Sequence, residues 1–264
     1  MYKNKLRSLD IAFIFLGGLV LLFIISPLLG MFLSTTPIQL FETSKDPEVL
    51  KSIWLTLRVS FLGTVFFAVG AIPLSYFLAR SNFKLKKLIN GIIDIPIVIP
   101  HSAAGIAILG FISRDSVLGK IASSVGLNFV GHPVGIALAM AFVSIPFLIN
   151  AARDGFENVP VKLEKTALNL GASPVRVFFS ISLPLAWKNI LSGLVMMFAR
   201  GLSEFGAVVI VAYHPMITPV MIYERFGSFG LKYARPISVL FILVCLIFFI
   251  LLRALTKEKE HRNA

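Results

Sequence analysis

Long hydrophobic runs separated by short polar stretches make up most of the chain. A helix of about 20 residues crosses the hydrocarbon core of a bilayer, which is roughly 30 Å thick. Prolines inside such runs are compatible with membrane helices, because neighbouring groups satisfy the freed carbonyls. The pattern predicts an all-α polytopic membrane protein with six transmembrane helices, in a single domain over residues 1–264. The predicted spans are approximately 11–33, 53–78, 93–113, 133–152, 187–213 and 236–253.

The composition is that of a membrane protein. Of the 264 residues, 57% are hydrophobic and 14% are charged, whereas soluble domains carry about 25% charged residues. The mean hydropathy is +0.88. The net charge of +12 would suit nucleic acid, but the basic residues flank hydrophobic segments, so membrane lipid is the expected partner and nucleic acid is not. The single cysteine, Cys245, forms no internal disulfide, and the first run lacks a signal-peptide cleavage site.

Loop charges predict the orientation, because cytoplasmic loops carry an excess of Lys and Arg. One set of flanks contains Lys3, Lys5, Arg7, Arg80, Lys84, Lys86, Lys87, Arg153, Lys162, Lys165, Arg176, Lys188, Arg253, Lys257, Lys259 and Arg262. The opposite loops contain fewer than half as many, namely Lys45, Lys51, Arg114, Lys120, Arg225, Lys232 and Arg235. Both termini and the polar stretch 157–184 are therefore predicted to be cytoplasmic.

The polar stretch 157–184 interrupts the membrane-like pattern with helix signals. Pro160 favours the start of a short helix, since proline is preformed for the first helical position. Gly171 can end this helix in a left-handed conformation, and Ser173, followed by a proline, can start a second one. The apolar face of the first helix is formed by Leu163, Ala167 and Leu170. Such a helix needs a surface outside the bilayer, which is either a partner protein or lipid headgroups.

The sequence contains no catalytic or nucleotide-binding signature. There is no G-x-x-x-x-G-K-[ST] phosphate loop, and no cytoplasmic stretch is long enough for an ATPase domain. The 4 histidines are scattered rather than at metal-ligand spacing, and no serine lies in a G-x-S-x-G motif. The chain is therefore predicted to be non-catalytic, with no metal site and no cofactor of its own. A pump built on it would receive energy from another subunit.

The fifth predicted span contains two ionisable residues, Arg200 and Glu204. Their i, i+4 spacing allows them to pair on one helix face, and ionisable residues in membrane helices face the bundle interior or a cavity. One interpretation is a neutralised pair, alone or linked to Arg58 or Asp94, that fixes helix packing. The other is a patch beside a translocation path and its gate. The candidate pore or gate residues are Arg200, Ser203, Glu204, Phe205, Gly206 and Ser102.

The stretch EKTALNLGASPVRVFFSISLP, residues 164–184, resembles the cytoplasmic EAA loop of ATP-binding-cassette (ABC) importer permeases. The glycine and the I-x-L-P residues at the family spacing are Gly171, Ile181, Leu183 and Pro184. Ala167 matches the second alanine, while Lys165 and Thr166 replace the glutamate and the first alanine. The resemblance implies a coupling helix that docks into a groove of an ATPase subunit. The implied coupling residues are Glu164, Lys165, Thr166, Ala167, Gly171, Ala172 and Ser173.

The segment FARGLSEFGA, residues 198–207, resembles the oxyanion branch of these permeases, which transports molybdate, tungstate or sulfate. In the third span, Pro96, Pro100 and Gly105 fit the branch pattern P-x-x-x-P-P-x-x-x-G, and His101 replaces a proline. The stretch from Ser203 onward, SEFGAVVIVAYHPMITPVMIYERFGSFGLKYARP, is most similar to molybdate/tungstate permeases. Possible donors to such an anion are Ser102, Ser203, Arg200 and helix N-termini.

The resemblance implies the permease subunit of a type I ABC importer for molybdate/tungstate in a prokaryotic plasma membrane. It further implies a homodimer with a second copy of the chain, two ABC ATPase subunits that bind ATP and Mg at the cytoplasmic face, and an external oxyanion-binding protein. A sulfate or thiosulfate importer is the alternative within the class. Outside it are an ion-gradient-driven secondary transporter, which usually has more spans or an internal repeat, and an intramembrane enzyme, which the absence of a catalytic constellation disfavours.

Overall fold

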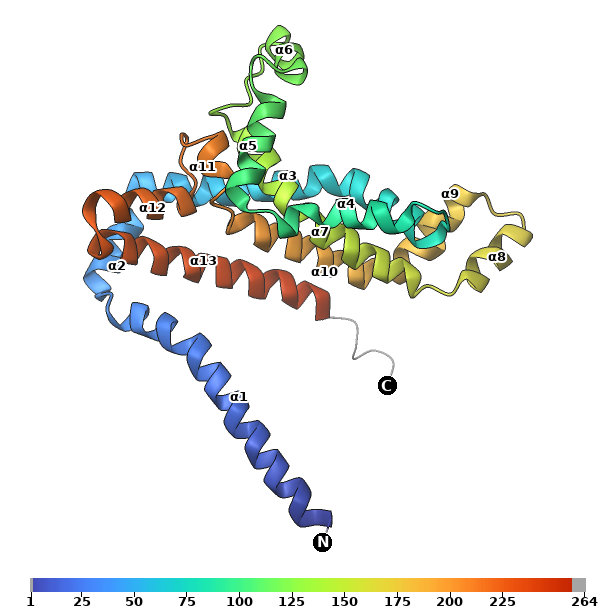
Figure 1. The fold of residues 1–264 in the computed structure, drawn as a ribbon, viewed down its shortest axis with the longest axis horizontal. Coiled ribbons are helices and arrows are strands. Elements are labelled where there is room, and N and C mark those ends of the chain that lie inside the picture. The colour runs from blue at the N-terminus through green and yellow to red at the C-terminus, as the bar shows by residue number, and fades with distance from the viewer. Residues whose placement is uncertain (1, 258–264) are drawn as a thin grey trace.

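The computed structural model describes residues 2–257, with side chains described for residues 9–252. Every regular element in that part of the chain is a helix, as the sequence predicts (Figure 1). The elements are α1 (Tyr2–Leu33), α2 (Pro37–Lys45), α3 (Pro47–Arg80), α4 (Lys86–Val98), α5 (His101–Ile112), α6 (Val117–Ser124), α7 (Pro133–Glu157), α8 (Val161–Asn169), α9 (Pro174–Val177), η1 (Phe178–Ser182), α10 (Leu183–Leu202), α11 (Val208–Val211), α12 (Thr218–Phe229) and α13 (Leu231–Lys257).

Some residues of the predicted cytoplasmic charge set lie beyond this description. Lys259 and Arg262 lie outside the described residues. The side chains of Lys3, Lys5, Arg7, Arg253 and Lys257 lie outside the range for which side chains are described.

The centre of the molecule is α7, which packs along both α3 and α10 (Figure 1). Small side chains let these helices approach closely, and serines join them by hydrogen bonds, as is common between membrane helices. Ser60 on α3 donates to the carbonyl of Phe198 on α10 at 2.9 Å. Ser75 on α3 donates to the carbonyl of Ile149 on α7 at 3.1 Å. The three helices therefore form the frame to which the other elements attach.

The third predicted span, 93–113, is not one straight helix. It consists of α4 and α5, which meet at an angle of 110°. Ile99 is extended, because the residue before a proline is disfavoured in the helical region, and Pro100 has no N–H to continue the helix. As a result α5 and α6 leave the bundle sideways (Figure 1). Within residues 2–257, five helices are long and apolar enough to cross a membrane, and the bent pair brings the number to 6 if it counts as one span.

The fifth predicted span, 187–213, also differs from one continuous helix. Its first helical stretch starts earlier, at Pro174, and ends at Leu202. Residues 203–207 are non-helical, and α11 is a single turn. The carboxylate of Glu204 accepts the N–H of Ala207 at 2.9 Å, which stabilises this break. The prediction that Glu204 extends the helix of Arg200 is therefore wrong, although the two side chains do pair.

The helix that enters the fifth span contains a π-helical segment, η1, between α9 and α10. Pro184 explains it, since proline cannot donate to the carbonyl four residues earlier and its ring would collide with that carbonyl. A wider turn removes the collision without breaking the helix. The proline of the I-x-L-P motif thus shapes the start of this span.

The first helix, α1, stands away from the bundle (Figure 1). Its side chains from residue 9 to residue 30 are exposed, although an 18-residue stretch within Leu9–Leu33 has a mean hydropathy of 2.7. Such a surface is stable only in lipid or against another apolar protein surface.

Candidate functional site

The polar stretch between α7 and α10 lies at one end of the bundle (Figure 1). It forms the short helices and the turn that its proline, glycine and serine residues predict. Pro160 precedes α8, and Gly171 turns the chain with a φ of 87°, a conformation that disfavours any residue with a side chain. Ser173 then accepts the backbone N–H of Arg176 at 3.3 Å and caps α9. We call residues 157–184 the coupling loop, after the role that the sequence resemblance implies for them.

The outward surface of the coupling loop is partly apolar. Leu163, Leu168 and Leu170 are exposed, and Leu170 is 83% exposed. A hollow of about 360 Å³ lies between α8 and the start of the fifth span, lined by Ala167, Leu170, Gly171, Ala172, Arg176, Val177, Ser180 and Ile181. Of the predicted coupling residues, Lys165, Thr166, Gly171 and Ser173 are exposed, and Ala167 and Ala172 are half-buried. Exposed leucines beside the exposed Lys162 and Lys165 fit both partners that the sequence predicts, a protein surface and lipid headgroups.

Glu164 differs from the other predicted coupling residues, because it is buried and faces its own chain. Its carboxylate pairs with Arg80, and it accepts a hydrogen bond from Ser182 at 2.6 Å. Sequence reasoning did not single out Arg80 or Ser182. Arg80 lies 84 positions from Glu164, so no local spacing could have indicated the pair.

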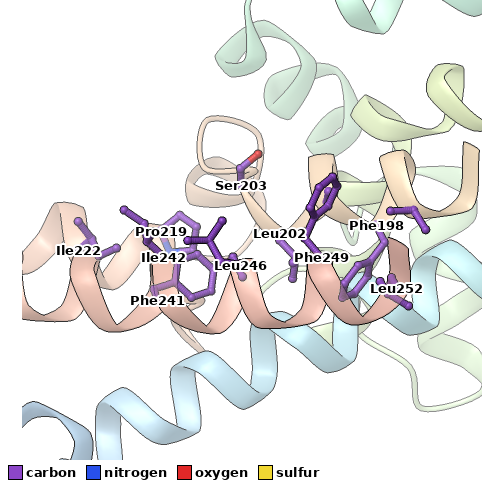
Figure 2. Close-up of a pocket in the computed structure, with 13 residues that line it drawn as sticks. Phe198, Leu202, Ser203, Pro219, Ile222, Phe241, Ile242, Leu246, Phe249 and Leu252 are labelled. Carbon is purple, nitrogen blue, oxygen red and sulfur yellow. The ribbon is translucent and has the colours of Figure 1, made fainter. Parts of the chain in front are cut away.

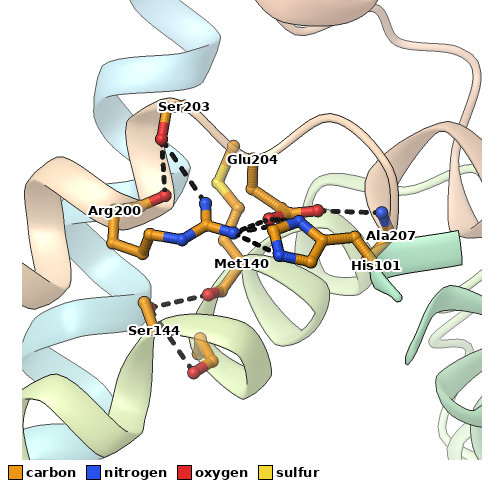
Figure 3. A network of polar contacts seen from close by, with 8 residues as sticks. His101, Met140, Ser144, Arg200, Ser203, Glu204 and Ala207 are labelled. Carbon is orange, nitrogen blue, oxygen red and sulfur yellow. Dashed lines mark hydrogen bonds and ion pairs between the residues drawn. The ribbon is translucent and has the colours of Figure 1, made fainter. Parts of the chain in front are cut away.

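A polar junction forms where the two broken spans meet (Figure 3). Glu204 is fully buried, and its Oε2 lies 2.9 Å from Arg200 Nη2 and 3.0 Å from His101 Nδ1. Neither approach is an aligned hydrogen bond, and the one from Arg200 is an ion pair. Arg200 Nη2 also lies 2.8 Å from His101 Nε2. The junction therefore joins the start of α5 to the end of α10 through polar side chains.

Glycines allow this close approach. A Cβ on Gly206 would lie 2.7 Å from the Cβ of His101, and a Cβ on Gly105 would lie 2.9 Å from the Cα and carbonyl oxygen of Ala207. Both distances are shorter than packed carbons allow. The glycines at these positions therefore have a packing reason, and side chains there would push α5 away from the break after α10.

The remaining candidate residues lie around the junction in different ways. Ser203 is exposed and accepts from Arg200 Nη1 at 3.4 Å, and Ser102 is exposed in the first turn of α5. Phe205 instead packs on Tyr223 of α12, with ring centroids 4.9 Å apart. Sequence reasoning noticed His101 only as a departure from a proline pattern. The one local signal was a polar residue directly after Pro100.

The sequence of the bundle, including the coupling loop, matches a family of known proteins. Residues 71–260 match the family described as binding-protein-dependent transport system inner membrane component. The chain belongs to this family. It is accordingly a multi-pass membrane permease.

Relatives of this permease extend over nearly its whole length. It is 41% identical over 248 residues, 94% of this chain and 97% of the relative, to the molybdate/tungstate transport system permease protein WtpB of Methanocaldococcus jannaschii. It is 31% identical, over 84% of this chain and 80% of the relative, to the probable sulfate transport system permease protein cysT of Marchantia polymorpha. Its fold is similar to that of a bacterial ABC transporter that imports alginate, with a TM-score of 0.75, 17% identity and coverage of 98% and 99% of the two chains.

The permease also has an apolar groove of about 540 Å³ between α10, α12 and α13 (Figure 2). Its lining includes Phe198, Leu202, Phe241, Phe249 and Leu252, and Ser203 lies at its edge. A hydrated dianion would lose its water there without gaining donors. The groove is therefore not a site for an oxyanion. Among the described residues, no group of three or more His, Cys, Asp or Glu side chains could hold a metal ion.

Proposed function

We propose that this permease is the transmembrane subunit of an ABC importer that takes up molybdate or tungstate across a prokaryotic plasma membrane. The observation that carries the proposal is the 41% identity, over nearly all of both chains, to a curated molybdate/tungstate permease. A sulfate importer is the second candidate, supported by the more distant sulfate relative. In either case the chain is the non-catalytic part of the complex.

The energy source in this proposal is a pair of ABC ATPase subunits that bind ATP and Mg and dock on the coupling loops. The exposed leucines and the hollow beside Gly171 support this assignment. An oxyanion-binding protein delivers the substrate at the opposite, external end. Both termini lie on the cytoplasmic side, as the loop charges favour.

The complex contains two copies of the permease. The apolar, unpartnered surface of α1 supports this assembly, because a second copy would cover it. One six-span chain also encloses only part of a pathway. The groove between α10 and α13 offers a further apolar surface for a neighbouring helix or lipid.

The translocation path runs beside the polar junction. Arg200 and the exposed Ser102 and Ser203 offer donors to a tetrahedral dianion. Glu204 holds Arg200 at 2.9 Å, so the cation is already balanced by a carboxylate and does not bind the anion tightly. Weak contact of this kind suits a substrate that must leave the membrane after entering it.

The docking surface makes one specific prediction. Leu170→Asp places a charge at the most exposed leucine of the coupling loop, directly after α8. We expect it to weaken copurification of the ATPase subunits about tenfold, since central apolar residues of an interface contribute most of its binding energy. Leu127→Asp is the matched control, because Leu127 is also an exposed leucine but lies between α6 and α7, in a loop that the charge distribution predicts to be external. Equal ATPase binding by both variants would contradict the assignment.

The substrate is tested in cells that lack this permease. The cells are grown with scarce molybdate and tungstate and ample sulfate, and their molybdenum, tungsten and sulfur contents are measured. The proposal predicts a selective loss of molybdenum or tungsten that the intact gene restores. Normal metal content with a new sulfur requirement would assign the permease to sulfate instead.

A further inference from the structure

A buried charged cluster ties the coupling loop to two membrane spans. Glu164 lies on α8, and its side chain is only 7% exposed. Arg80 is the last residue of α3 and donates two hydrogen bonds of 2.8 Å to this carboxylate, from Nε to Oε2 and from Nη2 to Oε1. Ser182, the last residue of η1, donates to the same carboxylate at 2.6 Å. Arg80 Nη2 also donates to the carbonyl of Val159, in the link between α7 and α8, at 3.0 Å.

Aromatic packing supports this cluster from the side of the bundle. The ring of Tyr76 on α3 lies 5.2 Å from that of Phe156 on α7 and 5.0 Å from that of Phe178 on η1. The guanidinium of Arg80 lies 5.8 Å above the Tyr76 ring. The helices α3, α7 and η1 therefore pack on one another directly beside the Glu164 carboxylate, and this aromatic packing fixes the position of the cluster.

Without this cluster, α8 has few attachments to the spans. It packs mainly on α9 and η1, which follow it closely in the chain. Its two ends are the turn at Pro160 and the turn at Gly171, where a short helix can pivot. A bidentate Arg–carboxylate pair fixes both distance and angle, and a buried one is hardly screened by water. Glu164 therefore decides whether α8 pivots or moves with the bundle.

We infer that Arg80, Glu164 and Ser182 form a clamp that makes the coupling loop move as one body with α3 and α10. The inference rests on the proposed function, since it concerns how a force from the ATPase subunits reaches the spans. The helix α10 carries Arg200 in its last turn, so a displacement of the loop displaces the polar junction as well. The three clamp residues position the loop and do not touch the substrate.

The test compares Glu164→Gln with the unaltered permease in a complex with its ATPase subunits and binding protein, reconstituted in liposomes. We expect the subunits to assemble and ATP to be hydrolysed, while the amount of molybdate or tungstate imported per ATP falls roughly fivefold, a typical size for coupling between sites. Spin labels at Lys162→Cys on α8 and Leu185→Cys on α10, in a Cys245→Ser background, report whether the loop moves independently. Their distance distribution should be narrow in the unaltered clamp and broad in Glu164→Gln.

Control variants separate the clamp from general stability. Glu48→Gln removes an exposed ion pair with Arg225, 2.7 Å away and far from the coupling loop in the chain, and should leave both readouts unchanged. Ser182→Ala and Arg80→Lys keep the carboxylate partly paired, and they carry the test if Glu164→Gln does not accumulate. Each should broaden the label distance and lower import per ATP by about twofold or more, as for other residues that couple distant sites.

The clamp and the proposed substrate can fail separately. If the unaltered complex imports neither molybdate nor tungstate, the proposed substrate is wrong, and the label distances in the same samples still decide on the clamp. A narrow distance in the clamp variants, together with import per ATP equal to that of the unaltered complex, would overturn the inference.

Discussion

Glu204→Ala is expected to destabilise the permease by about 3–5 kcal/mol, since removing one partner of a buried pair leaves the other charge uncompensated. Glu204 is fully buried, and Arg200 and His101 both face its Oε2. The substitution also removes the acceptor of the Ala207 N–H that holds the break after α10. Thermal unfolding of the purified protein in lipid nanodiscs measures the effect, and transport should be lost with it.

The matched control for this variant is Glu48→Ala. Glu48 also pairs with an arginine, Arg225, at 2.7 Å, but its side chain is 70% exposed. Exposed pairs contribute little to stability. If the two alanine variants unfolded at the same temperature, the polar junction would not make the contribution to stability that we predict.

Gly171→Val is expected to abolish import while ATP hydrolysis continues. A side chain at Gly171 would meet open space, so the effect comes from the backbone, whose φ of 87° disfavours L-residues and most of all β-branched ones. A valine would force this turn into another conformation, at a cost of about 1–2 kcal/mol, and would move α8 relative to α9. The measurement is substrate imported per ATP hydrolysed in reconstituted complexes, with an expected fall of about tenfold or more.

Gly171→Asn separates backbone conformation from side-chain bulk. Asparagine adopts the left-handed conformation more readily than other non-glycine residues, so this variant should keep most of the import. Equal loss in both variants would mean that bulk matters at this position. Normal import by Gly171→Val would contradict the role of the coupling loop.

The coupling loop was predictable from the sequence because its signals are local. Pro160, Gly171 and Ser173 each specify a backbone conformation by themselves, and the structure has the expected turns at these positions. The breaks in the third and fifth spans were not predictable from hydropathy, which measures apolar content and not continuity of a helix. Pro73 and Pro146 remain inside helices while Pro100 does not, so proline alone does not mark a break.

The contacts that define the candidate site depend on tertiary structure. His101 and Arg200 are 99 positions apart, and Arg80 and Glu164 are 84 apart, so their pairing follows only from the packing of the spans. For the same reason the sequence suggested that Glu164 belongs to an exposed docking face, whereas the structure buries it. The i, i+4 spacing did identify Arg200 and Glu204 as partners, but a turn rather than a helix brings them together.

The helix α10 connects the two regions that matter for transport. It has 20 residues and so extends over about 30 Å, with the clamp at its N-terminal end and Arg200 near its C-terminal end. A rigid helix of this length moves as a unit, whereas the non-helical residues 203–207 that follow it can change angle. This arrangement gives a direct mechanical route from the coupling loop to the polar junction.

The most direct test of the central claim is transport by the purified complex. The permease is reconstituted in liposomes with its ATPase subunits and binding protein, and accumulated molybdate, tungstate and sulfate are measured with and without ATP. We predict that molybdate or tungstate accumulates only with ATP, and that sulfate at equal concentration does not compete with their uptake. Accumulation driven by an ion gradient in the absence of ATP would contradict it.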